Sequence, residues 1–322
     1  MKAVVIEKAG DPEQLIYKDV PRPEVKNGWS LVKVMGFGIN HSEIFTRKGL
    51  SPSVKFPRIL GIECVGIIEE TTDPKRLPQG QKVISIMGEM GRAFDGSYAE
   101  YVLLPNEQIY PVHTSLDWAD LAAVPETYYT AYGSLLNLQL TEKDNVLVRG
   151  ASSGVGIAFL KLAKALYPGI TVVGSSRHVE KEQQLLNAGF DHIVLEKNRK
   201  LVTDQVFTKI FELVGPATIK DSFKHLREKG IVCSSGQLGN QWYLENFDPI
   251  TDLAPNSYLT SFYSGNVDEE KLNQLLALIV EKDIDVTPSR VFHLDQLPQA
   301  HEYLESTNGL GKVVVLNKWA RN

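Results

Sequence analysis

The stretch from Gly150 to Gly156 carries the residue types that point most directly to chemistry in this 322-residue chain. It reads Gly-Ala-Ser-Ser-Gly-Val-Gly, and it follows the apolar run Val146–Val148 and precedes a helix expected from Ile157. A turn of small residues between a strand and a helix lets backbone N–H groups approach a pyrophosphate, and the helix N-terminus adds partial positive charge. The pattern predicts a dinucleotide site contacted by Ala151, Ser152, Ser153, Gly154, Val155 and Gly156.

This turn departs from the usual dinucleotide fingerprint, which has glycine at three positions. Those positions hold Ala151, Ser153 and Gly156 here, so two of the three glycines are replaced by other small residues. Strand-to-helix turns are also rich in small residues for packing reasons alone. A turn without a ligand is therefore the alternative.

The end of the next predicted strand indicates which dinucleotide binds. From Gly174 to Arg177 the sequence is Gly-Ser-Ser-Arg, without the Asp or Glu that would bind a free ribose 2′-hydroxyl. Arg177 would instead form charge-assisted hydrogen bonds to a 2′-phosphate, assisted by the Ser175 and Ser176 hydroxyls and by Lys181 or Lys197. NADP(H) is the expected cofactor, and the alternative is that Arg177 only begins a solvated, charged helix.

Composition sets the class of protein. Hydrophobic residues make up 43% and charged residues 23% of the chain, which is ordinary for a soluble enzyme. A net charge of −5 argues against a nucleic-acid partner, and no apolar run approaches membrane-spanning length. The N-terminus reaches charged residues before a secretory apolar core could form, so we expect a cytoplasmic protein. Cys64 and Cys233 lie in apolar stretches and are expected to be buried thiols without a disulfide.

The arrangement of apolar runs predicts two domains. Short strands separated by Pro and Gly, up to residue 117, suggest a partly open antiparallel barrel or sandwich. A helical stretch from Trp118 to Leu136 follows, and strands and helices then alternate, which is typical of a parallel sheet covered on both faces. We expect the final strands to return to the first domain, so that residues 1–117 and 266–322 flank a nucleotide domain of residues 118–265.

Five segments together resemble the medium-chain dehydrogenase/reductase superfamily, and most closely its zinc-independent quinone oxidoreductase and zeta-crystallin branch. They are Gly38–Glu43, Pro57–Glu63, Thr130–Tyr132, Gly150–Gly156 and Gly311–Val314. The resemblance covers essentially the whole chain. It implies an α/β protein with a GroES-like, partly open β-barrel catalytic domain, a Rossmann domain with a doubly wound parallel sheet, and a homodimer.

The resemblance also bears on zinc. Zinc alcohol dehydrogenases of this superfamily take their catalytic ligands from three segments, where this chain has Asn40, Ile62 and Glu126. An open catalytic zinc needs three N, S or carboxylate ligands, and Ile62 cannot coordinate a metal. The four-cysteine lobe is also missing, because residues 88–92 contain no Cys. The expectation is a protein without a catalytic metal.

The resemblance further implies site residues. Asn40 and Glu43 would line the cleft near the nicotinamide, Thr130 would touch the cofactor, and four further residues would frame the carboxamide: Ser235, Gly236, Gln237 and Phe262. Each has a structural alternative, since Asn40 can satisfy a turn, Glu43 can cap a helix and Thr130 can bond within its helix.

No proton donor is singled out by the sequence. Quinone and enoyl reductases of this group often carry Tyr in the segment matching Phe45, so a phenol is absent there. Other side chains, or solvent, could take its place: Tyr128, Tyr129, Tyr263 or His41.

The leading functional prediction is an NADPH-dependent, zinc-independent transfer of hydride to a quinone or an α,β-unsaturated carbonyl. In such acceptors the arriving electrons spread onto a carbonyl oxygen, so no Lewis acid is needed. Two alternatives are an alcohol dehydrogenase with a non-standard metal site and a non-catalytic, crystallin-like protein that binds NADPH.

Overall fold

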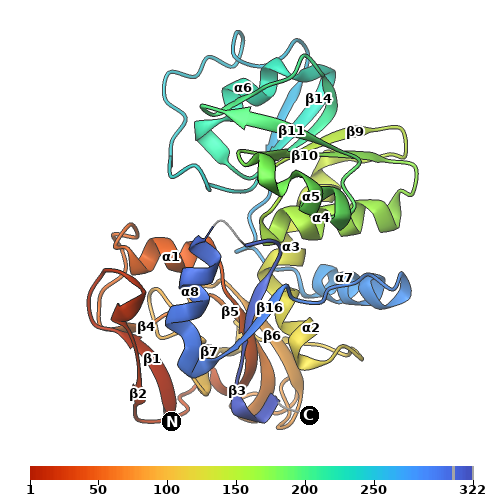
Figure 1. Cartoon of the computed structure of the whole chain (residues 1–322). Coiled ribbons are helices and arrows are strands. Elements are labelled where there is room, and N and C mark those ends of the chain that lie inside the picture. Colours follow the sequence, from red (N-terminus) through yellow and green to blue (C-terminus); the bar gives the residue numbers. More distant parts are fainter. Residues whose placement is uncertain (307–308, 321–322) are drawn as a thin grey trace. The chain divides into compact units, whose positions relative to one another are not determined.

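The computed structural model describes residues 1–306 and 309–320, and the chain divides into two compact units. Unit 1 consists of Met1–Tyr129 and Ser264–Asn322, and unit 2 of Thr130–Tyr263. In Figure 1 unit 1 therefore combines the red to yellow start of the chain with its blue end. No helix among the described residues is long and apolar enough to cross a membrane.

Unit 1 is built mainly from antiparallel strands. Its strands are β1 (Lys2–Ile6), β2 (Leu15–Asp19), β3 (Trp29–Gly38), β4 (Arg58–Ile59), β5 (Glu63–Glu70), β6 (Lys82–Ile86), β7 (Tyr101–Pro105), β8 (Tyr110–Pro111), β16 (Arg290–His293) and β17 (Val313–Leu316). Its helices are η1 (Pro12–Gln14), α1 (His41–Arg47), η2 (Asn106–Gln108), α2 (Trp118–Ala123), α7 (Glu269–Glu281), η5 (Leu294–Gln296), α8 (Leu297–Glu305) and η6 (Lys318–Ala320). The larger sheet has the order β16-β17-β3-β5-β6-β8, with β7 also paired to β3, and the smaller sheet has the order β2-β1-β4.

The end of the chain completes the sheet of unit 1. Strand β17 pairs antiparallel with β3, so that Val314 lies opposite Gly38 and Leu316 opposite Gly36. Four consecutive residues from Lys312 to Val315 are buried, which explains why this terminal apolar run pairs with the central strand. The final strands thus lie in the same unit as the first strands of the chain.

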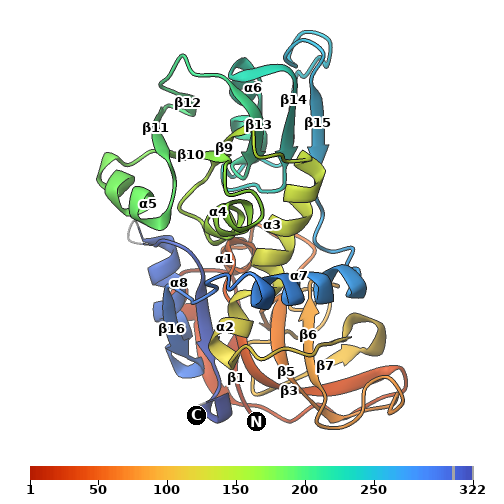
Figure 2. The ribbon, with the colours of Figure 1, turned by 90° about the vertical axis from the view of Figure 1, so that its right-hand side faces the viewer.

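Unit 2 is a parallel sheet with helices on both faces. Its strands are β9 (Asn145–Arg149), β10 (Thr171–Ser176), β11 (His192–Lys197), β12 (Lys200–Leu201), β13 (Phe207–Glu212), β14 (Leu226–Ser234) and β15 (Tyr258–Ser261). Its helices are α4 (Gly154–Leu166), η3 (Val179–Lys181), α5 (Glu182–Ala188), η4 (Gly215–Ala217) and α6 (Ile219–Lys224). Figures 1 and 2 show α4 and α5 on one face of the sheet and α6 on the other.

The strand order of unit 2 places the nucleotide turn. The order is β12-β11-β10-β9-β13-β14-β15, and apart from the short β12 each pair is parallel. The chain runs outward from β9 in one direction and from β13 in the other, so the order reverses between these strands. Ligands of doubly wound sheets bind beyond the carboxyl ends of the strands at such a reversal. The turn from Gly150 follows β9 directly, and the predicted α/β class with a parallel sheet is confirmed.

The helical stretch between the two strand-rich regions differs from the expectation. It forms two helices, α2 and α3 (Pro125–Leu138), because Pro125 begins a new helix as a residue without a backbone N–H. Helix α2 packs on β3 and β17 through its buried Leu121, Ala122 and Ala123. The unit boundary therefore falls within α3, after Tyr129, and the predicted boundary before residue 118 is too early.

Candidate active site and nucleotide site

Asn40 and Glu43 lie together at the start of α1 in unit 1. The backbone N–H of Asn40 donates to Glu43 Oε2 over 3.1 Å, and Glu43 N donates to the Asn40 carbonyl over 3.2 Å. Glu43 is thus the first-turn acid that ties down the residue before the helix. Its side chain is buried, whereas Asn40 is partly exposed.

Glu63 and Lys312, which are 249 positions apart, form a buried ion pair in contact with Asn40. Lys312 Nζ donates to Glu63 Oε1 over 2.6 Å and to Asn40 Oδ1 over 2.7 Å. Asn40 Nδ2 donates to Glu63 Oε1 over 2.8 Å, and Glu126 N donates to Glu63 Oε2 over 2.8 Å. Both ends of the Asn40 carboxamide therefore contact a charged partner.

Gly38, the last residue of β3, leaves the space that this pair occupies. An added Cβ there would lie 2.1 Å from Lys312 Cε and 2.5 Å from Glu63 Oε1. Both distances are far inside van der Waals contact. Any side chain at this position would displace Lys312 or Glu63.

The two carboxyl groups of this cluster have different partners. Glu43 accepts from Asn40 N, from Ile62 N over 3.3 Å and from Asn40 Nδ2 over 3.4 Å. Burial, together with the nearby Glu63 charge, raises the pKa of Glu43 to about 7, and Lys312 opposes the rise. The cluster therefore contains a carboxyl group that can carry a proton near neutral pH.

The other candidate proton donors are held in structural contacts or lie at the surface. Tyr128 Oη donates to Asp285 O over 3.2 Å, and Tyr129 Oη accepts from Asp268 N over 2.8 Å. Burial raises the pKa of both phenols, and it lowers the pKa of His41 to about 4. Tyr263 is exposed.

The predicted phosphate turn joins β9 to α4. Gly150 has φ +87°, a left-handed conformation that favours glycine. Ser153 caps α4, because its Oγ accepts from Gly156 N over 3.1 Å and donates to Gly150 O over 2.7 Å. An added Cβ at Gly156 would lie 2.7 Å from Gly150 O, so only glycine fits the first turn of α4. The first backbone N–H groups of α4 have no partner within the helix.

The residues expected to read the ribose lie at the end of β10 and in η3. Ser175 and Ser176 are buried at the end of the strand, and the Ser176 hydroxyl bonds the backbone of His178. Lys181 is buried as well, and burial together with the charge of Arg177 lowers its pKa. Two cations thus lie near each other beside the strand, which is a favourable arrangement for a phosphate.

Of the residues expected around the nicotinamide carboxamide, Ser235 and Phe262 contact each other. Ser235 Oγ lies 2.8 Å from Ser134 Oγ and accepts from Phe262 N over 3.3 Å. The Phe262 ring is seated where Gly133 has no side chain, since an added Cβ would lie 2.0 Å from ring atom Cε2. Thr130 is buried on α3 one turn before Ser134. Gly236 packs on Leu213, and Gln237 turns toward the Trp242 carbonyl.

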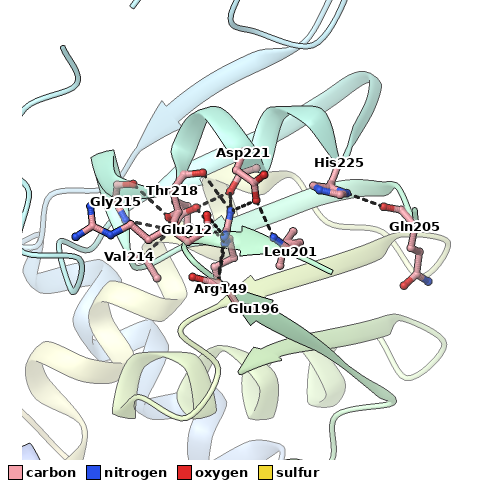
Figure 3. A network of polar contacts seen from close by, with 12 residues as sticks. Arg149, Glu196, Leu201, Gln205, Glu212, Val214, Gly215, Thr218, Asp221 and His225 are labelled. Atoms are coloured by element: carbon pink, nitrogen blue, oxygen red, sulfur yellow. Dashed lines mark hydrogen bonds and ion pairs between the residues drawn. The ribbon is translucent and has the colours of Figure 1, made fainter. Parts of the chain in front are cut away.

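Directly before the turn, Arg149 anchors the end of β9 in a buried polar network (Figure 3). Its guanidinium contacts Glu196 and Asp221 over 3.1 Å each and also donates to the Thr218 carbonyl over 3.1 Å. Glu212, whose Oε2 is 3.9 Å from Arg149 Nε, completes the network. These contacts tie β9, β11, β13 and α6 together and hold the strand end from which the turn departs.

Comparisons with known proteins agree with this architecture. Residues 26–114 match the alcohol dehydrogenase GroES-like domain, and residues 188–315 match the zinc-binding dehydrogenase domain. The chain is 27% identical to quinone oxidoreductase of Lama guanicoe over 335 residues, which cover 99% of this chain and 98% of that protein. The chain belongs to the medium-chain dehydrogenase/reductase superfamily. It is an oxidoreductase of the quinone oxidoreductase-like kind.

Solved structures of this superfamily share the whole fold. Quinone oxidoreductase from Coxiella burnetii superimposes with a TM-score of 0.82 at 24% identity, covering 98% of this chain and 99% of that one. A mycobacterial protein complexed with NADPH has the same TM-score, identity and coverage. The predicted GroES-like and Rossmann domains are confirmed by the domain match and by these likenesses of fold.

The superfamily's zinc positions bear different side chains in this member. Asn40 bonds Lys312 and Glu63, and the Glu126 carboxylate accepts from Ser264 Oγ over 2.8 Å. Within residues 1–306 and 309–320 no group of three or more His, Cys, Asp or Glu side chains has the arrangement of a metal site. The absence of a catalytic zinc stays a prediction that rests on Ile62.

Sequence reasoning missed the roles of Glu63 and Lys312. From the sequence, the two residues were used as parts of the family segments Pro57–Glu63 and Gly311–Val314, and no partner was assigned to either. The available signal was a charged residue inside an apolar run: Glu63 precedes Cys-Val-Gly-Ile-Ile, and Lys312 precedes Val-Val-Val. A buried charge needs a partner, but only the fold shows which of the chain's cations reaches Glu63.

Proposed function

We propose that this medium-chain dehydrogenase/reductase protein is an NADPH-dependent, zinc-independent reductase of quinones or α,β-unsaturated carbonyls. The observation that supports NADPH as the cofactor is the pair Arg177 and Lys181, which follows β10. The end of β10 itself holds no acidic residue. Such a pair would attract a 2′-phosphate, whereas a carboxylate there would repel it. Binding of NADPH by the mycobacterial neighbour supports the same cofactor.

The residues of the turn fit the remainder of a dinucleotide. Gly154, Val155 and Gly156 would direct backbone N–H groups at the pyrophosphate, as the positive end of α4 favours. Thr130, Ser235, Gly236, Gln237 and Phe262 would surround the nicotinamide end. When bound, NADPH supplies a hydride.

Asn40 and Glu43 would act on the acceptor. Hydride addition to an enone or quinone places negative charge on a carbonyl oxygen, and an amide N–H or a carboxyl proton stabilises that charge. Asn40 is partly exposed and is fixed by charged partners, so it can orient an acceptor without a metal. The names of the curated relatives support a quinone as acceptor.

Substitution of Arg177 tests the cofactor. Arg177→Ala should weaken NADPH binding about tenfold to a hundredfold, as expected for the loss of hydrogen bonds to a charged group, while NADH binding changes little. Titration of cofactor fluorescence gives both dissociation constants. The exposed Arg227 of β14 is the matched control, and Arg227→Ala should leave both constants unchanged. Equal losses for the two cofactors in Arg177→Ala would overturn the 2′-phosphate assignment.

A panel of acceptors tests the reaction. The absorbance of NADPH should fall when a simple quinone or enone is added, at a rate that a chelator does not change. Loss of activity with the chelator and recovery with zinc would support the alternative, an alcohol dehydrogenase with a non-standard metal site. Tight NADPH binding without turnover of any carbonyl acceptor would support the non-catalytic, crystallin-like alternative.

We propose a homodimer as the assembly, formed through the edge strand β15 of unit 2. Strand β15 is the last in the sheet order, and its Tyr258 and Leu259 are 59% and 41% exposed. An apolar strand edge on a soluble protein favours pairing with another strand, and a second copy offers an identical one. Light scattering should give a dimer mass for the wild type and a monomer mass for Leu259→Lys, and a monomeric wild type would contradict the assembly.

A further inference from the structure

Four side chains of unit 1 form one connected hydrogen-bonded network. Lys312 bonds Glu63 and Asn40, Asn40 bonds Glu63, and Asn40 also contacts Glu43. The members come from α1, β5 and the residue before β17, so only the folded sheet brings them together. Glu63 is fully buried, Glu43 and Lys312 nearly so, and Asn40 is the partly exposed member.

The charges of Lys312 and Glu63 determine which way the Asn40 carboxamide points. An ammonium group only donates, so Lys312 Nζ at 2.7 Å identifies the Asn40 oxygen. A carboxylate only accepts, so Glu63 Oε1 at 2.8 Å identifies the Asn40 nitrogen. A flipped amide would place oxygen against carboxylate and N–H against ammonium. The pair therefore fixes one orientation of the residue that the proposed reaction uses.

The same contacts distinguish the two carboxyl groups. Glu63 accepts three hydrogen bonds of 2.6 to 2.8 Å, one of them from an ammonium group. Glu43 accepts three bonds of 3.1 to 3.4 Å from neutral donors. One ammonium group can balance only one of two buried carboxylates. The geometry thus pairs Glu63 with Lys312, and among the described residues Glu43 bonds no cation.

We infer that Lys312 and Glu63 are positioning residues of the active site, which fix the Asn40 carboxamide and leave Glu43 as the carboxyl group that keeps its proton. The inference deepens the proposed function and rests on it for its chemical consequence. Burial raises the pKa of Glu43 to about 7 and that of its other titratable neighbour, Tyr98, well above the usual phenol value, so the phenol stays neutral. Glu63 repels the Glu43 anion, and Lys312 attracts it.

A protonated Glu43 supplies the proton that reduction of the acceptor needs in addition to the hydride. The hydride carries two electrons and forms the new C–H bond, and a π-electron pair of the acceptor moves onto the carbonyl oxygen. The O–H bond of Glu43 then breaks, the proton bonds that oxygen, and Glu43 becomes a carboxylate. Water returns the proton after product leaves, so the step needs no co-reactant besides NADPH, the acceptor and water.

The experiment is a titration of the side-chain carboxyl carbons by ¹³C NMR in glutamate-labelled protein without cofactor. The Glu43→Gln variant identifies the Glu43 signal, and the exposed Glu107, replaced by Gln, is the matched control that should change no midpoint but its own. In the wild type Glu43 should titrate at about pH 7. In Glu63→Gln the midpoint should move to lower pH, because the repelling anion is gone and Lys312 remains.

In Lys312→Met the last proton of the carboxyl pair should leave at higher pH than in the wild type, because two carboxylates then share no cation. A purely structural pair would not move the Glu43 midpoint in opposite directions in these two variants. Titration of Glu43 at its ordinary value in the wild type, or shifts of the same sign in both variants, would overturn the inference.

A double variant separates folding from positioning. Glu63→Gln with Lys312→Met removes both charges together, so it avoids an unpaired buried ion and should stay folded by thermal unfolding. Its kcat should still fall about tenfold or more while NADPH binding is retained, because Asn40 has lost its orientation. Wild-type kcat in this folded double variant would overturn the positioning role. Failure of NADPH binding in the wild type would overturn the proposed function and leave the titration valid.

Discussion

In unit 2 the buried Arg149 lies among three carboxylates, whereas in unit 1 the buried Lys312 lies beside two. Around Arg149 the acids are heavily bonded: Glu212 alone accepts from Val214 N, Gly215 N and the Thr218 and Ser222 hydroxyls over 2.5 to 3.1 Å. Burial raises the pKa of Glu212, and Arg149 and these donors oppose the rise. Together with the Arg149 contacts to Glu196 and Asp221, these bonds hold the strands in place.

Glu43 in unit 1 lacks that compensation. Its three donors are neutral and lie at 3.1 Å or more, and its neighbour Glu63 takes the Lys312 ammonium group. A buried acid therefore becomes a proton carrier when its surroundings offer few hydrogen-bond donors and little positive charge. The planar, multiply donating guanidinium suits the structural network, and the compact ammonium group suits the site.

Removal of the Arg149 guanidinium should give the largest effect. Arg149→Met leaves the buried Glu196 and Glu212 and the partly buried Asp221 without this cation and should lower the free energy of unfolding by about 3–5 kcal/mol. Denaturant unfolding measures it. The exposed Arg227 gives the matched control, and Arg227→Met should change stability by less than about 0.5 kcal/mol. A loss in Arg149→Met no larger than in the control would remove the structural half of the comparison.

The second-largest effect should be a pH dependence of the unfolding free energy that arises from the proton on Glu43. Burial raises the folded-state pKa of Glu43 from 4.5 to about 7, so the native state binds more protons than the unfolded chain between these values. Stability contributed by this group is full below pH 4.5 and is lost as the pH rises to about 7, by about 3 kcal/mol in all. The unfolding free energy of the wild type relative to Glu43→Gln should fall across that window, and a constant difference would contradict the raised pKa.

A side chain at Gly38 should have a smaller effect on stability. The Ala methyl would lie 2.1 Å from Lys312 Cε, so the lysine must move and Gly38→Ala should cost about 1–3 kcal/mol. Gly169 is the matched control, because an added Cβ there meets its nearest atom at 3.5 Å and its backbone φ is not positive. Chemical unfolding compares the two, and equal stability would show that Gly38 does not reserve space for the ion pair.

Much of the fold follows from local patterns in the sequence. Alternating apolar runs predicted the parallel sheet, and the small residues from Gly150 predicted the turn that follows β9. The short strands expected before residue 117 are also observed, from β1 to β8. Helix α1 and strand β2 were not predicted: α1 has only seven residues, and three of the five residues of β2 are exposed, so neither produces a long apolar period.

The active-site network could not be predicted in the same way. Glu63 and Lys312 are 249 residues apart, and their pairing depends on the return of β17 to β3 and on the space at Gly38. The Arg149 network depends similarly on α6 and β11 lying beside the end of β9. Periodicity and propensity describe single elements, whereas these networks arise from the order of strands in the sheet.

The most direct test of the account is the pH dependence of kcat for NADPH-driven reduction of a quinone or enone by metal-free protein. A chelator should not change this turnover, and kcat should decline above about pH 7 as Glu43 loses its proton. In Glu43→Gln, kcat should fall about a hundredfold and the decline should disappear. A Glu43→Gln enzyme with wild-type kcat and the same alkaline decline, or a wild type that works only with added zinc, would contradict it.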